Sequence, residues 1–247
     1  MDRWRNKVAI VTGASAGIGA AIAAKLVEEG LQVVGLARRV DRIEALSKQL
    51  SGKSGKLYAY KTDMTKEDDI LNAFKWVTDH VGPVSILINN AGIVQPTDLM
   101  NGDTDKWRKT FDTNVLGLCI ATREAIKIMQ TNNIDGHIVH INSVAGHKIP
   151  NAPNLNVYPA SKHAVTALTE TLRLDLIRIG SKIKISSISP GFVTTEIIEA
   201  NNIQIDKNRS IPALDAVDVA NAVLYVLSTP PNVQVHELII KPLGEIF

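Results

Sequence analysis

Short runs of apolar residues alternate with segments of helical periodicity along the whole chain. The apolar runs have the length and composition of strands buried in a sheet. The segments between them repeat apolar residues at intervals of three and four, which is typical of helices that pack one face on a core. We therefore predict strands at residues 8–11, 33–36, 57–60, 86–89, 137–141, 183–188 and 237–240. We predict helices at residues 18–29, 42–50, 66–80, 157–179 and 214–227, and one or two more at 103–130.

Regular alternation of strands and helices favours a parallel sheet with helices on both of its faces. The predicted fold class is α/β, a Rossmann-like doubly wound parallel sheet of seven strands. No repeat, low-complexity tract or linker divides the chain, so residues 1–247 are expected to form a single domain. The longest irregular stretch, 194–212, is expected to be a substrate loop, because loops of that length are usually functional.

Charge and cysteine content limit the partners of the protein. The 27 basic and 25 acidic residues leave a net charge of +2, which implies no strong attraction to nucleic acid or acidic lipid. Cys119 is the single cysteine, which excludes an internal disulfide and fits a reducing compartment. The first seven residues do not resemble a signal peptide, and no run is long enough to span a membrane. We expect a cytoplasmic protein with a small-molecule partner.

A glycine-rich loop follows the first predicted strand and leads into the first helix. Residues 12–19 read TGASAGIG, so the glycines have the spacing Gly-x-x-x-Gly-x-Gly. Glycines at such a turn let a pyrophosphate approach backbone N–H groups at the helix N-terminus. No lysine follows Gly19, which disfavours a nucleoside triphosphate. The residues expected to bind the pyrophosphate are Gly13, Ser15, Gly17, Ile18 and Gly19.

The end of the second predicted strand indicates the cofactor. An acidic residue there would bind the ribose 2′-hydroxyl of NAD, whereas arginine accommodates the 2′-phosphate of NADP. Arg38 and Arg39 occupy this place, so we predict NADP(H), although both could be ordinary surface charges. After the third strand, Asp63 and Met64 are placed to meet the adenine. Asp63 could equally cap the helix that begins near Thr65.

Tyr158 and Lys162 are the candidate catalytic pair. They are four residues apart in a predicted helix and therefore lie on one face of it. An ammonium group beside a phenol is expected to lower the tyrosine pKa. A tyrosine with a lowered pKa can exchange a proton with an alcohol oxygen.

These motifs resemble those of the short-chain dehydrogenase/reductase family, and they occur in the family's order. The resemblance covers nearly the whole chain, and parts of it are similar to insect and animal members that act on carbonyls, retinol or farnesol. The matching positions are the loop ending at Gly19, the sequence NNAG at residues 89–92, Asn114, Ser143, Tyr158 with Lys162, and Pro190 with Gly191.

The resemblance implies a role for each matching residue. Tyr158 would be the general acid/base, and Lys162 would lower its pKa and hold the nicotinamide ribose. Ser143 would hydrogen-bond the substrate oxygen, and Asn114 would anchor a water that relays protons to Lys162. Further cofactor contacts would come from Asn90, Ala91 and Gly92 after the fourth strand, and from Pro190, Gly191, Val193 and Thr195 after the sixth.

Other functions fit the sequence less well. His137 and His140 are three apart on a strand and have no Cys or acidic cluster beside them, so no metal site is predicted. Ser143 lacks the Gly-x-Ser-x-Gly turn of a hydrolase nucleophile. The longer relatives that act as epimerases or dehydratases usually carry a larger C-terminal substrate domain. Only 56 residues follow Gly191 in this chain, which disfavours that function. A dinucleotide-binding regulator without turnover is the alternative, which the complete catalytic set disfavours.

Two further expectations concern the substrate and the assembly. The stretches expected to line the substrate pocket, 144–155 and 192–205, are mostly apolar, which favours a lipophilic alcohol or carbonyl such as an isoprenoid, a retinoid or a steroid. The helix at 115–129 is apolar nearly all round, and Ala160, Ala164, Leu168 and Leu172 form an apolar line on the next long helix. We therefore expect a homodimer or homotetramer that contacts through these helices.

Overall fold

A computed structural model of the chain describes residues 1–151, 154–195 and 212–245, and within them a seven-stranded parallel sheet. The strand order is β3-β2-β1-β4-β5-β6-β7, so the chain starts near the middle and winds outward in both directions. This confirms the predicted fold class. The strands are β1 (Val8–Thr12), β2 (Gln32–Ala37), β3 (Lys56–Lys61), β4 (Val84–Asn89), β5 (His137–Ile141), β6 (Lys184–Pro190) and β7 (Glu237–Ile240).

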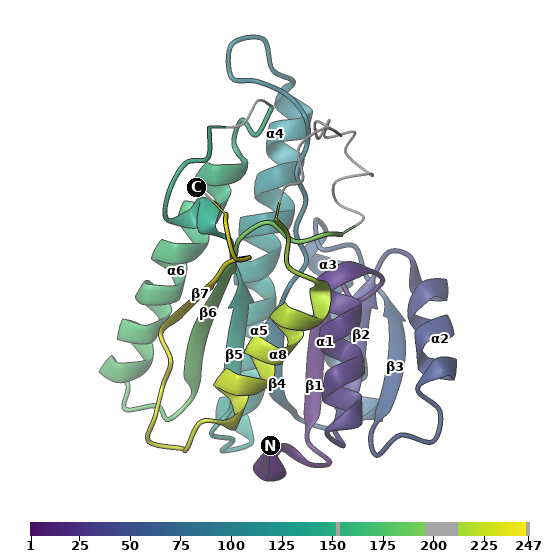
Figure 1. Ribbon diagram of the computed structural model, residues 1–247. Coiled ribbons are helices and arrows are strands. Elements are labelled where there is room, and N and C mark those ends of the chain that lie inside the picture. Colours follow the sequence, from purple (N-terminus) through teal and green to yellow (C-terminus); the bar gives the residue numbers. More distant parts are fainter. Residues whose placement is uncertain (152–153, 196–211, 246–247) are drawn as a thin grey trace.

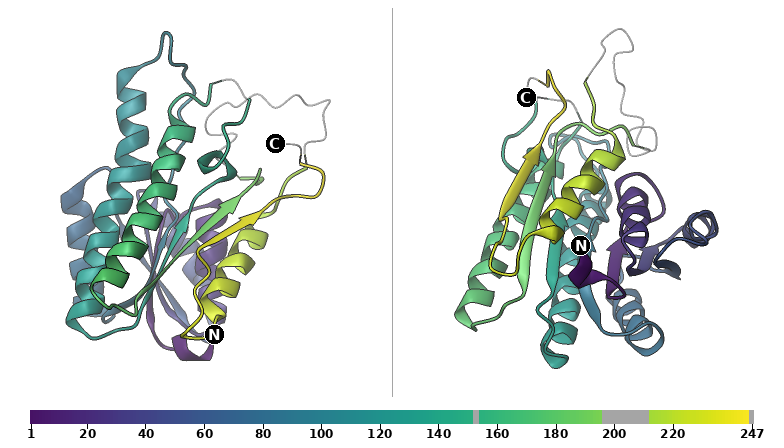
Figure 2. Two further views of the ribbon diagram at one scale, coloured as in Figure 1. Left: turned by 90° about the vertical axis from the view of Figure 1, so that its left-hand side faces the viewer. Right: turned by 60° about the horizontal axis from the view of Figure 1, so that its bottom comes forward.

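Helices cover both faces of the sheet (Figures 1 and 2). Neighbouring residues of a strand point to opposite faces, so Ala9 and Val11 of β1 enter one hydrophobic core while Val8 and Ile10 enter the other. The first core packs under α1 (Gly17–Glu28) and α8 (Ala216–Ser228). The second packs under α3 (Glu67–His80), α5 (Gly117–Thr131) and the end of α6 (Tyr158–Arg178). Strands buried on both faces explain why the apolar runs in the sequence are continuous.

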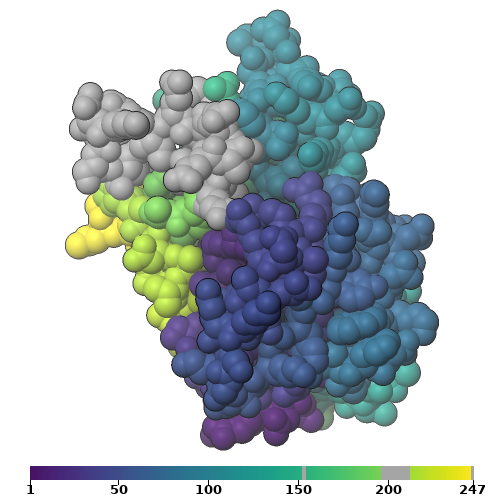
Figure 3. Space-filling model, turned by 90° about the vertical axis from the view of Figure 1, so that its right-hand side faces the viewer, coloured from purple at the N-terminus to yellow at the C-terminus, as the bar shows by residue number. Residues whose placement is uncertain are grey.

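The remaining helices lie at the margins of the sheet. The short helix α2 (Val40–Gln49) packs beside β3, and it faces the viewer in Figure 3 with the teal residues around α4 above it. There are also two short 3₁₀ turns: η1 (Asp2–Trp4) lies before β1, and η3 (Val144–Gly146) lies between β5 and α6. No helix in the described ranges is both long and apolar enough to cross a membrane.

The predicted helical region at 103–130 contains a break. It divides into α4 (Thr104–Phe111), a π-helical turn η2 (Asp112–Leu116) and α5. A π-turn inserts one residue into the helical repeat, and such turns are frequent at functional sites. Here it carries Asn114, one of the predicted catalytic residues.

His137 and His140 are buried in β5, and each ring has a hydrogen-bond partner within the protein. His137 Nε2 lies 2.9 Å from Ser186 Oγ, and His140 Nδ1 lies 2.9 Å from Thr169 Oγ1. Burial lowers the pKa of each ring to about 3, so both are neutral at physiological pH. Among the described residues, no three His, Cys, Asp or Glu side chains gather into a possible metal site.

Candidate active site

The carboxyl ends of β1 and β4 lie next to each other where the winding of the sheet changes direction, and hydrogen bonds join them there. Thr12 Oγ1 accepts the backbone N–H groups of Asn90 and Ala91, each at 3.0 Å. Asn90 Nδ2 donates to the carbonyl of Thr12 at 2.9 Å. In an open α/β sheet, a change of direction leaves a crevice at the carboxyl ends of the strands, and ligands bind in it. These bonds therefore fix the floor of the predicted dinucleotide site.

The glycine loop approaches this floor so closely that side chains would not fit. Gly13 has φ +69° and Gly17 has φ +54°, a left-handed conformation that glycine adopts without strain. A Cβ at Gly19 would lie 2.4 Å from both the carbonyl oxygen of Gly13 and Asn90 Nδ2. The loop thus leaves the start of α1 open to a ligand, which fits a pyrophosphate on the helix N-terminus.

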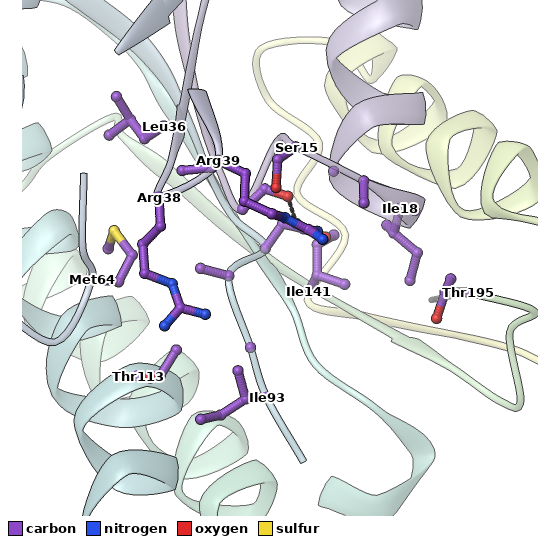
Figure 4. A pocket seen from close by; sticks show the side chains of 18 of the residues that line it. Ser15, Ile18, Leu36, Arg38, Arg39, Met64, Ile93, Thr113, Ile141 and Thr195 are labelled. Carbon is purple, nitrogen blue, oxygen red and sulfur yellow. Dashed lines mark hydrogen bonds between the residues drawn. The ribbon is translucent and has the colours of Figure 1, made fainter. Parts of the chain in front are cut away.

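A cleft of about 440 Å³ runs over the carboxyl ends of the strands and brings most of the predicted site residues together (Figure 4). It extends from Arg38 and Arg39 across the glycine loop to Tyr158 and Lys162. The predicted residues that line it are Gly13, Ser15, Gly17, Ile18, Gly19, Arg38, Arg39, Asp63, Met64, Asn90, Ala91, Gly92, Tyr158, Lys162 and Thr195.

Positive charge is concentrated at one end of the cleft. Arg38 and Arg39 are exposed, and their guanidinium groups point in different directions (Figure 4). Asp63 lies between cations: burial would raise its pKa, but hydrogen bonds from Thr65 and the charges of Arg38 and Lys66 lower it. The Asp63 carboxylate accepts from the backbone and hydroxyl of Thr65, whereas Lys66 is the N-cap of α3. Asp63 therefore lines the cleft and does not cap the helix.

The first turn of α6 carries Tyr158 to the other end of the cleft. Asn156, two residues earlier, has φ +39° although it is not glycine. Its side-chain amide donates to the carbonyl of Gln95 at 2.6 Å, and its side-chain oxygen accepts the N–H of Val157. Asn156 thus ties the start of α6 to the segment after β4, and strained backbone of this kind is often found at active sites.

The tyrosine pKa differs from the expectation drawn from the sequence. Burial raises the pKa of Tyr158 above its usual value, and a hydrogen bond with Ser143 opposes this rise. The Lys162 ammonium lies 5.8 Å from the centre of the Tyr158 ring and donates instead to the carbonyl of Ile141 at 2.9 Å. In this geometry the direction of the Tyr158 pKa shift is opposite to the one expected from the four-residue spacing, because burial outweighs the groups around the phenol.

Lys162 is buried, with 7% of its surface exposed. This burial lowers its pKa to about 8. The Lys162 side chain also lines the cleft. A hydroxyl group entering the cleft could therefore approach this cation directly.

Asn114 lies behind the cleft and holds its wall in place. Its side-chain oxygen accepts the N–H of Ile93 at 2.8 Å, and its amide donates to the carbonyl of Ile93 and to Ser161 Oγ, each at 3.0 Å. The π-turn thus directs Asn114 toward both α6 and the segment after β4. In this geometry Asn114 positions the elements on either side of Lys162.

Three predicted cofactor contacts do not line the described cleft. Pro190 is buried at the end of β6, the Gly191 N–H donates to the carbonyl of Ile240, and Val193 pairs with Leu214. Most of the predicted substrate loop, at 196–211, lies outside the described residues.

The sequence prediction missed several residues that the structure brings to the cleft or its floor. Thr12 precedes the first glycine directly, so its position could have suggested a role in fixing the loop. Gln95, Lys109 and Thr113 line the cleft but belong to no recognisable motif.

The strand order and the glycine-lined cleft at the carboxyl ends of the strands are those of a Rossmann-like fold. The family match makes this specific: the chain matches the short chain dehydrogenase family over residues 7–206 and belongs to that family.

Known proteins similar to this chain match it over all or most of their own length. A farnesol dehydrogenase of Aedes aegypti is 53% identical, with all of both chains covered. The dehydrogenase/reductase SDR family member 11 of Mus musculus is 45% identical, covering all of this chain and 98% of that one. Among solved structures, a closed serine dehydrogenase complexed with NADP⁺ is similar with a TM-score of 0.87 and 28% identity, covering 97% and 96% of the two chains. A Burkholderia phymatum short chain dehydrogenase/reductase in complex with NAD has a TM-score of 0.84 and 28% identity, covering 97% and 90%.

Proposed function

We propose that the protein is an NADP(H)-dependent oxidoreductase that interconverts a lipophilic alcohol and its carbonyl. The observation that carries this proposal is the arrangement along one cleft. Arg38 and Arg39 lie at one end, the glycine loop lies between, and Tyr158 with Lys162 lies at the other end. When bound, the nicotinamide would supply or accept the hydride. The protein's own part is to bind, to orient and to move a proton.

Tyr158 is the proposed general acid/base. Its pKa is raised by burial, so the hydroxyl holds its proton at neutral pH and can donate it to a carbonyl oxygen. In the opposite direction the same oxygen would accept the proton of an alcohol. Ser143 hydrogen-bonds Tyr158 and is therefore within reach of the same substrate oxygen. Lys162 would bind ribose hydroxyls and favour the ionised form of Tyr158 once they occupy the cleft.

The arginines support NADP over NAD. Two guanidinium groups suit a 2′-phosphate, because each can form bidentate, charge-assisted hydrogen bonds. Asp63 follows β3, whereas the carboxylate that binds a ribose 2′-hydroxyl stands at the end of the second strand, and Asp63 Oδ1 already accepts from the backbone and hydroxyl of Thr65. Family membership alone does not decide between the cofactors, because related structures are bound to NADP⁺ or to NAD.

A lipophilic substrate is supported by the relatives and by the lining of the cleft. The farnesol dehydrogenase of Aedes aegypti matches this chain from end to end. Near Tyr158 the cleft is lined by Ile93 and Ile141. A panel of isoprenoid, retinoid and steroid alcohols and carbonyls, tested with both cofactors, would identify the substrate class. Absence of turnover together with tight NADPH binding would favour a regulatory protein instead.

Replacing Tyr158 with Phe should remove the proton donor and leave the rest of the cleft intact. General acid–base catalysis typically contributes ~10²–10⁴ in rate, so we expect a loss of kcat of that size. NADPH affinity, measured by fluorescence titration, should change little. Tyr225→Phe is the matched control, because Tyr225 is 57% exposed on α8. Wild-type turnover by Tyr158→Phe would refute the role of Tyr158.

Replacing Arg38 with Ala should weaken NADPH binding selectively. Hydrogen bonds to charged groups are worth about 1.5–3 kcal/mol, so we expect about tenfold or greater loss for NADPH and little change for NADH. Calorimetric titration of both cofactors measures the ratio. Arg108→Ala is the control, because Arg108 pairs with Asp105 on α4 and does not line the cleft. Tighter binding of NADH than NADPH by the wild type would contradict the NADP assignment.

We further propose that the protein is at least a dimer through the outer faces of α5 and α6. Exposed apolar side chains occur on and beside these helices: Leu116 is 54%, Leu174 46% and Ile177 62% exposed. Leu168→Glu should weaken association, measured by light scattering, before it affects NADPH binding. Leu99→Glu is the control, since Leu99 is 65% exposed in the loop before α4. A wild-type monomer at micromolar concentration would be evidence against this interface.

A further inference from the structure

The segment after β7 returns to the end of β6, beside the cleft. The N–H of Gly191 donates to the carbonyl of Ile240 at 2.8 Å, which aligns the end of β6 with the end of β7. The chain then turns, with Gly244 at φ +87°, and brings Glu245 back to the residues that follow β6. In Figure 1 this yellow segment lies at the edge of the sheet where the strands end.

The Glu245 side chain is buried, with one carboxylate oxygen hydrogen-bonded and the other ion-paired. It is only 1% exposed. Oε2 accepts the backbone N–H of Phe192 at 3.0 Å, and Oε1 lies 3.2 Å from Lys241 Nζ. A buried carboxylate is costly unless it is paired and hydrogen-bonded, so both partners are needed to keep it in this place. The catalytic set proposed above makes no use of this buried charge.

Gly191 is in direct contact with this carboxylate. A Cβ at Gly191 would lie 2.1 Å from Glu245 Oε2, and the three atoms nearest to that Cβ all belong to Glu245. The side of Gly191 that lacks a side chain therefore faces Glu245. Within this structure, a side chain at position 191 would have to displace the Glu245 carboxylate.

The segment that Glu245 holds leads directly into the cleft. Leu214 fixes its other side, because Leu214 N donates to the carbonyl of Phe192 at 2.8 Å and Thr194 N donates to the carbonyl of Leu214 at 3.0 Å. The next residue, Thr195, lines the cleft, and its Cγ2 would lie 3.2 Å from a Cβ at Gly17. A shift at Phe192 would therefore move Thr195 relative to the glycine loop.

We propose that Glu245 is a positioning residue that sets the backbone of residues 191–195 and so fixes the nicotinamide end of the cleft. This inference rests on the proposed function and on the expectation, implied by the family resemblance, that residues 190–195 meet the nicotinamide. Glu245 touches neither cofactor nor substrate in this scheme and acts through Gly191 and Phe192. Its loss should disturb the nicotinamide half of the cofactor and spare the phosphate half.

The test compares NADPH with 2′-phospho-ADP-ribose, which lacks the nicotinamide, by calorimetric titration of the full chain. Glu245→Ala should bind NADPH several-fold more weakly and the fragment as tightly as the wild type does. Its kcat should fall by about tenfold to a hundredfold, since displacement of reacting groups by about 1 Å can cost that much. Glu245→Gln keeps an oxygen acceptor for the Phe192 N–H and should recover most of both losses. Leu243→Ala, in the same segment and 100% exposed, is the control.

If Glu245→Ala weakens the binding of NADPH and of the fragment equally, or changes the binding of neither, the positioning role is overturned. The proposed function would remain intact in both cases. A wild type that binds neither ligand would overturn the proposed function itself. If Glu245→Ala does not fold, Gly191→Ala replaces it, because the added methyl group displaces the carboxylate. It should show the same selective loss for NADPH, and unchanged binding by Gly191→Ala would overturn the proposal.

Discussion

The burial of the Lys162 ammonium is the constraint around which the site is organised. A charge removed from water is costly, and in this site a backbone carbonyl, that of Ile141, accepts one of its protons. Burial lowers the pKa of Lys162 to about 8, so its ammonium is still mostly charged at neutral pH. A cation held in this way favours ligands that bring oxygen atoms to it. Lys162 lines the cleft, so a ligand in the cleft can reach it.

The surrounding structure keeps that cation and Tyr158 in place from several directions. The π-turn directs Asn114 onto Ser161 and Ile93, which fixes α6 against the segment after β4. Asn156 ties the first turn of α6 to Gln95. Thr12 joins the ends of β1 and β4 beneath the glycine loop. Each contact joins elements that are distant in sequence, so the site depends on the order of the strands in the sheet.

Periodicity and composition were sufficient to predict the strands, the parallel sheet and the glycine loop, because each depends on local residue patterns. The predicted residues of the loop, the arginine pair and Tyr158 with Lys162 meet in one cleft, since they follow strands whose ends share an edge. These motifs occur in a fixed order along the chain, so the sequence alone indicates the family.

Other features could not be predicted from the sequence because they depend on packing. The pKa of Tyr158 is set by burial and by the direction of the Lys162 ammonium, which the four-residue spacing does not specify. The π-turn has no distinctive composition. Glu245 meets Phe192 across 53 residues of sequence, and no local pattern marks that contact. Residues 196–211, which include most of the predicted substrate loop, lie outside the described structure.

The proposed function requires Lys162 and Tyr158 to form a proton-transfer pair once the cofactor is bound. It can be tested directly by NMR of protein labelled with ¹³Cζ-tyrosine, in which each of the four tyrosines reports its own ionisation. The Tyr158 signal is assigned from its absence in Tyr158→Phe. Without added cofactor it should ionise at higher pH than an ordinary tyrosine, because burial raises its pKa. With saturating NADP⁺ its ionisation should move to lower pH, since added positive charge near the phenol favours the phenolate. An identical titration with and without NADP⁺ would contradict the account.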